Sequence, residues 1–198
     1  MRLSLGHTML EISYPLACLM TTILLIDHSM NIWICFLAAL MHEGGHLLVL
    51  QCCHTPPRHI RLSLFDIAIV DRQTYRHTRS QALAITLAGI TVNFLSALIG
   101  WLLWRITSWT WLPVFVTAHL TLGLFNALPV SSLDGGQALC LLLSQRYSPR
   151  TTQRILTVLS VAVLLPTACL GFYWLLKTRY NFTLLLVSLY LLVVLLKE

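Results

Sequence analysis

The chain has 198 residues, of which 57% are hydrophobic and only 10% are charged. Because soluble domains carry about 25% charged residues, this composition excludes an ordinary soluble protein and indicates a membrane protein. The formal net charge of +6 would suit a nucleic-acid partner, but the placement of the basic residues argues against one.

Apolar runs long enough to cross a bilayer predict an all-α polytopic protein with six transmembrane helices. The first run contains Glu11 and is followed by no small-residue cleavage site, so we expect a retained helix rather than a signal peptide. The polar segments are too short for a separate soluble domain, which predicts a single domain over residues 1–198. The predicted spans are 9–26, 32–50, 82–104, 111–128, 155–176 and 182–196.

The basic residues fall mainly on one side of the predicted membrane. Arg105, Lys177 and Arg179 lie on one side, and the other ten of the 13 Lys and Arg residues lie on the opposite side. The positive-inside rule then places both termini in the cytoplasm, and the tryptophans between residues 101 and 111 form an aromatic belt at the other face. Topology thus explains the basic excess, with weak attraction to anionic lipid headgroups as an addition, and we expect no nucleic-acid partner.

The segment between the second and third spans is the longest polar region. Hydrophobic and polar residues alternate from Ile60 to Leu64 and again, with the phase shifted, from Phe65 to Ile69. Such alternation is typical of strands, and a phase shift is typical of a turn or bulge. We expect one or two short strands in this cytoplasmic loop, although an amphipathic loop on the membrane surface would show the same pattern.

The second span contains the sequence HEGGH. His42 and His46 are four residues apart, so on a helix they share a face and could bind one metal ion. Glu43 lies beside that ion without having to bind it and could activate a water there. An isolated HExxH occurs by chance, but an ionisable residue at mid-bilayer costs about 2.5–3.5 kcal/mol on insertion scales. Gly44 and Gly45 add to this cost and make sense if something approaches the backbone closely. The motif therefore predicts a metal site.

A catalytic zinc usually has three protein ligands and one open position. The fourth span ends near Pro129 at the depth of the histidine pair, and Asp134 follows, before two glycines. Non-helical backbone at membrane depth is tolerated where it lines a polar cavity. Asp134 is the candidate third ligand, and a helix cap or turn is the alternative. His119, two turns before Asn126, either lines the same cavity or is simply packed.

The two motifs together resemble those of the site-2 protease family of intramembrane zinc metalloproteases. That family carries HExxH in one spanning helix and NxxPxxxxDG in a later one, which Asn126, Pro129, Asp134 and Gly135 match here. The resemblance covers the second to fourth spans and the order of the others.

A third family signature is matched by Gly89 and Asn93, although Ile90 stands where a proline is common. The six-helix plan is similar to the branch that includes the stage IV sporulation protease. A C-terminal nucleotide-sensing domain, which some members of that branch carry, and a PDZ insertion are not expected in this sequence.

The resemblance implies that His42, His46 and Asp134 bind Zn²⁺ and that Glu43 is the general base. It also implies that Asn126 helps to hold the substrate backbone or the developing oxyanion, although Asn126 could instead satisfy a backbone group freed by Pro129.

An exposed strand edge could bind the unwound substrate by strand addition. We expect this for Ile60, Leu62, Leu64 and Ile67.

The expected function is regulated intramembrane proteolysis of membrane-embedded protein substrates, near the cytoplasmic side of a prokaryotic cytoplasmic membrane. A regulatory partner or a homo-oligomer would be compatible with it. One alternative is a non-catalytic protein that binds membrane clients, which would have no need of Glu43. Another is a metal transporter, against which the apolar outer halves of the second and fourth spans argue.

Overall fold

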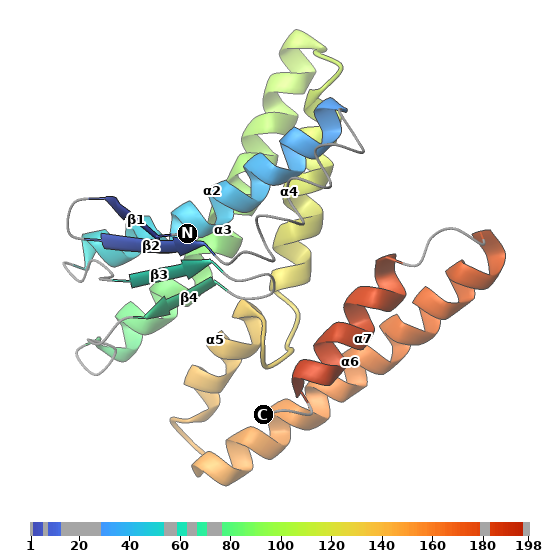
Figure 1. The fold of residues 1–198 in the computed structure, drawn as a ribbon. Coiled ribbons are helices and arrows are strands. Elements are labelled where there is room, and N and C mark those ends of the chain that lie inside the picture. The colour runs from blue at the N-terminus through green and yellow to red at the C-terminus, as the bar shows by residue number, and fades with distance from the viewer. Residues whose placement is uncertain are drawn as a thin grey trace. The chain divides into compact units, whose positions relative to one another are not determined.

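The computed structural model describes residues 2–5, 8–12, 29–53, 59–62, 67–70, 77–178 and 183–195. The chain divides into two compact units, Met1–Gly123 and Leu124–Glu198, and each is described by itself. Figure 1 shows a small sheet with long helices in the first unit, and helices in the second. That the chain forms a single domain stays a prediction.

The sheet of the first unit has four strands in the order β1-β2-β3-β4 (Figure 1). The β1–β2 and β3–β4 pairs are antiparallel, whereas β2 and β3 are parallel. Among the described strands, β3 thus has a neighbour on both sides, and β1 and β4 form the two edges. The strands are β1 (Arg2–Leu5), β2 (Thr8–Ile12), β3 (His59–Leu62) and β4 (Ile67–Val70).

Strands β3 and β4 fall in the segment whose alternation predicted strands, and the phase shift, with Leu64, lies outside the described residues. The first predicted span needs correction at its start, because Met9 to Ile12 belong to β2. A stretch of four residues with three apolar side chains fits a helix or a strand equally well, and pairing with β3, which is distant in sequence, decides between them. Residues 13–26 of that span lie outside the described residues.

Two long helices of the first unit pack side by side, α2 (Met30–Cys52) and α3 (Arg79–Thr107) (Figure 1). A capping box starts α3, in which the Thr78 hydroxyl accepts the Gln81 N–H and the Gln81 side chain accepts the Thr78 N–H. Close packing needs Gly45, because an added Cβ would lie 2.8 Å from the Val92 side chain and 3.0 Å from the Ala88 carbonyl oxygen.

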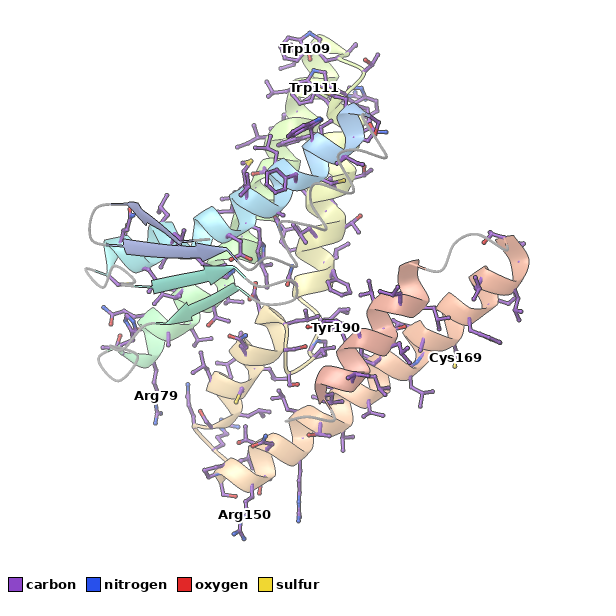
Figure 2. All side chains as sticks on the ribbon, viewed as in Figure 1. Arg79, Trp109, Trp111, Arg150, Cys169 and Tyr190 are labelled. Atoms are coloured by element: carbon purple, nitrogen blue, oxygen red, sulfur yellow. The ribbon has the colours of Figure 1, made fainter. Side chains whose placement is uncertain are left out.

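A turn at Ser108, in the left-handed conformation with φ 55°, ends α3 and leads into α4 (Leu112–Asn126). Trp109 and Trp111 stack at this turn with ring centroids 5.8 Å apart. Figure 2 shows both indoles at one end of α3 and Arg79 at the other end. Aromatic side chains gathered at one end are typical of a spanning helix, and the orientation of α3 in the membrane stays a prediction.

The second unit contains α5 (Asp134–Leu143), α6 (Pro149–Thr178) and α7 (Thr183–Leu195). Helices α6 and α7 pack against each other (Figure 1). The segment before α5 joins their core, which consists of Val130, Leu133, Leu164 and Leu191. The Ser131 N–H donates to Ser160 Oγ at 3.0 Å and so ties this non-helical segment to α6.

Three of the described helices, α2, α3 and α6, are long and apolar enough to cross a membrane. They coincide with the second, third and fifth predicted spans, and α4 is a shorter apolar helix at the fourth. Large apolar side chains on them are exposed, among them Leu40, Leu95 and Leu165, which suits a lipid environment. These helices support an integral membrane protein, and the count of six spans stays a prediction.

Candidate metal centre

His42 and His46 face each other one turn apart on α2, and both are buried. Their rings meet edge to face with centroids 5.0 Å apart, and their Nε2 atoms lie 3.3 Å apart. Two nitrogens bound to one tetrahedral zinc ion at about 2.0–2.1 Å are themselves about 3.3–3.4 Å apart. The two imidazoles therefore have the spacing that two ligands of one zinc ion require.

The second nitrogen of His46 is fixed by the neighbouring helix. His46 Nδ1–H donates to the carbonyl oxygen of Ile85 on α3 at 2.7 Å. A proton on Nδ1 leaves the lone pair of a neutral imidazole on Nε2, where a metal would bind. His46 is thus held in a tautomer that is ready to accept a metal.

Gly89 of α3 lies directly against the two imidazoles. A Cβ added at this position would meet His46 Nε2 and would lie 2.6 Å from His42 Cε1. Glycine therefore leaves the space in which the ligand nitrogens lie. Gly45 shows the close backbone approach that the HEGGH sequence suggested, whereas an added Cβ at Gly44 meets no described atom within 4 Å.

A chain of buried polar groups continues from His42 into α3 and α4. Asn93 Nδ2–H donates to His42 Nδ1 at 3.0 Å, and His119 Nδ1–H donates to Asn93 Oδ1 at 3.0 Å. Asn93 and His119 are both fully buried at 0% exposure. The sequence left the role of His119 open. For the residues of α3 the sequence did contain a signal. Ile85, Gly89 and Asn93 recur every four residues, so they share the face of α3 that contacts the histidine pair.

Asp134 is the first residue of α5 in the second unit, and it is half-buried. The N-cap of α5 is Leu133, which makes no side-chain capping bond, so Asp134 is not the cap that the alternative interpretation proposed. Acidic residues are common in the first turn of a helix, where the helix dipole favours them.

Backbone packing fixes the start of α5 within its unit. Added Cβ atoms at Gly135 and Gly136 would meet the carbonyl oxygens of Ala127 and Val130, respectively. As Pro129 predicted, the chain leaves the helical conformation after Asn126 and resumes it at Asp134. The two glycines let the helix start lie against this irregular segment.

The other predicted site residues are distributed over both units. Glu43 is half-buried on α2 beside His42, and Asn126 is half-buried at the end of α4. Ile60 and Leu62 lie in β3 and Ile67 in β4. Within the first unit the structure brings together four polar side chains, those of His42, His46, Asn93 and His119.

The predicted ligands His42, His46 and Asp134 offer two imidazole nitrogens and one carboxylate oxygen. Nitrogen and oxygen donors of this kind are the ones that catalytic zinc uses, with a fourth position left open. The residues therefore fit the metal that the HExxH motif implies.

Comparison with solved structures finds the site-2 protease from Methanocaldococcus jannaschii, with a TM-score of 0.68 at 20% sequence identity. The similarity covers 100% of this chain and 94% of that one. No protein-family model and no curated protein matches the sequence. The chain therefore has the fold of a site-2 protease.

Proposed function

We propose that this chain is an intramembrane zinc metalloendopeptidase that hydrolyses peptide bonds of membrane-embedded proteins. The observation that carries the proposal is the buried histidine pair, whose Nε2 atoms lie at zinc-ligand spacing beside a glutamate in an apolar helix. The fold shared with a site-2 protease supports it. We place the enzyme in a prokaryotic cytoplasmic membrane, with both termini and the cleavage site on the cytoplasmic side.

His42 and His46 of the first unit and Asp134 of the second are the proposed zinc ligands. Two histidines and one carboxylate leave one position of a tetrahedral ion open for chemistry. Bound zinc would supply Lewis-acid polarisation of the substrate carbonyl and would make a water molecule more acidic.

Glu43 is the proposed general base and acid. From its place beside His42, its carboxylate would take a proton from the attacking water and then deliver that proton to the leaving amine. Asn126, at the end of α4, is the proposed donor to the substrate backbone or to the developing oxyanion.

Substrate binding by strand addition is restricted by the order of the sheet. Ile60 and Leu62 belong to β3, whose backbone pairs with β2 on one side and β4 on the other. A further strand could pair only with an edge, and Ile67 lies on the edge strand β4. We therefore propose β4 as the element that binds the unwound substrate.

Proline substitutions along β4 test this role. Alternate residues of an edge strand direct their N–H groups either to the neighbouring strand or to the open edge. Ile67 and Ile69 form one pair of alternate positions, and Ala68 and Val70 form the other. Proline in the pair whose N–H groups face the open edge should lower cleavage with zinc content and thermal stability unchanged. Proline in the pair whose N–H groups face β3 should destabilise the sheet. Full cleavage by all four single variants would contradict the role of β4.

The proteolytic activity is tested by Glu43→Gln, which removes the base and keeps the side-chain shape. Termini of membrane proteins are labelled and identified by mass spectrometry in cells that make the parent chain or the variant. We expect new termini near cytoplasmic membrane boundaries with the parent only, and equal zinc content in both proteins. Identical termini with both proteins zinc-loaded would contradict a protease and favour client binding. Zinc uptake into liposomes by the parent would favour a transporter.

A further inference from the structure

The hydrogen bonds around the histidine pair indicate a position for each imidazole proton. His46 carries its proton on Nδ1, because that atom donates to the Ile85 carbonyl oxygen. With that proton on Nδ1, the 3.3 Å contact between the two Nε2 atoms is a hydrogen bond when His42 Nε2–H donates to the His46 Nε2 lone pair. His42 Nδ1 is correspondingly an acceptor, and Asn93 Nδ2–H donates to it at 3.0 Å.

This arrangement suits a metal at His46 but not at His42. A neutral imidazole that binds a metal through Nε2 carries its proton on Nδ1 and donates it to a nearby acceptor. The group at His42 Nδ1 is the Asn93 amide nitrogen, which is also a donor. Two donors would then face each other in a buried site, which is costly.

A half-turn of the Asn93 amide removes this conflict. The oxygen and nitrogen of a side-chain amide occupy nearly equivalent positions, so the turned amide accepts from His42 Nδ1–H without a shift of the backbone. Its N–H then faces His119 Nδ1, which must offer a lone pair at the same 3.0 Å contact. The His119 proton consequently lies on Nε2, and every imidazole still holds one proton.

His119 is suited to this exchange by its surroundings. Its Nε2 is buried and has no hydrogen-bond partner among the described residues, so a change of tautomer breaks no bond there and replaces an unpaired acceptor by an unpaired N–H donor. The ring packs on Phe115 with centroids 4.3 Å apart. Gly123, one turn further along α4, lets the helix lie close to Asn93, since an added Cβ would be 3.2 Å from Asn93 Cβ.

We infer that Asn93 and His119 are positioning residues for the metal ligand His42: Asn93 presents its amide oxygen to His42 Nδ1–H, and His119 accepts the amide N–H. This inference rests on the proposed zinc function and adds a relay that spans α2, α3 and α4. Asn93 fixes the tautomer of His42, and His119 fixes the orientation of Asn93.

Four variants of the full chain in detergent separate hydrogen bonding from packing. Asn93→Leu and His119→Leu fill the space of the parent side chain with apolar groups and remove the hydrogen-bonding groups. Asn93→Asp keeps an acceptor for His42, and His119→Asn keeps an amide near the position of imidazole Nδ1. The zinc dissociation constant is measured by chelator competition, and the visible spectrum of the Co²⁺ form reports the geometry at the metal.

We expect Asn93→Leu to bind zinc about 10–100-fold more weakly, as is typical when the partner of a metal-bound histidine is removed. His119→Leu should weaken binding in the same direction by a smaller factor, and both leucine variants should alter the Co²⁺ spectrum. Asn93→Asp and His119→Asn should restore the affinity and the spectrum of the parent.

Parent-like affinity and spectrum in both leucine variants would overturn the inference and leave the proposed zinc function intact. So would an Asn93→Asp variant as weak as Asn93→Leu, because His42 would then need no acceptor. If the parent chain itself binds no zinc, the proposed function and the inference both fail.

Discussion

At Gly89 a single methyl group would occupy the space of two imidazoles. The added carbon would meet His46 Nε2 and lie 2.6 Å from His42 Cε1, and overpacking of this kind typically costs about 1–3 kcal/mol. We expect Gly89→Ala to weaken zinc binding by about 10-fold or more. Gly44→Ala is the matched control, because an added Cβ there meets no described atom within 4 Å. Equal zinc affinities for the two variants would show that the close approach of α3 does not matter to the metal.

The histidine pair could be predicted because it depends on local geometry alone. Residues four apart on a helix must share a face, so His42 and His46 needed no knowledge of any other element. The relay could not be predicted in the same way. Asn93 is 51 residues from His42, and His119 is 26 residues from Asn93, so both contacts exist only once three helices have packed.

Helix α5 depends at its start on glycines rather than on a capping side chain. Added Cβ atoms at Gly135 and Gly136 would meet carbonyl oxygens of the segment before the helix. We expect Gly136→Ala to displace the start of α5 and to lower the free energy of unfolding by about 1–3 kcal/mol. Gln137→Ala, at an exposed neighbouring position, should leave it unchanged. Thermal unfolding of the two variants makes the comparison, and equal midpoints would contradict the packing role of Gly136.

The glycines at its start also explain why α5 was not among the helices predicted from the sequence. Two glycines after Asp134 are typical of a turn, and Leu133 is not a usual N-cap residue. The irregular segment before it was predicted, because Pro129 has no N–H with which to continue α4. Strand β2 was missed for a different reason, since its partners β1 and β3 lie outside the apolar run itself.

Zinc should stabilise the whole molecule if His42, His46 and Asp134 bind one ion. A ligand present at 100 times its dissociation constant adds about 2.7 kcal/mol to the free energy of unfolding. We expect zinc to raise the unfolding midpoint of the metal-stripped chain, and the shift to disappear in both His46→Gln and Asp134→Asn. A full zinc shift in Asp134→Asn would exclude Asp134 as a ligand, and a full shift in His46→Gln would exclude the histidine pair.

The parallel pairing of β2 with β3 also constrains how the chain is threaded through the bilayer. The stretch from Ile12 to His59 leaves one sheet and returns to the same sheet. A chain that leaves and re-enters one compartment must cross the membrane an even number of times, and α2 is long and apolar enough to make one such crossing. Single cysteines at Thr8 and Arg61, in a variant without the six native cysteines, should therefore react with an impermeant reagent from the same side. Labelling from opposite sides would show that Thr8 of β2 and Arg61 of β3 lie in different compartments, and it would contradict the pairing of these two strands in the membrane.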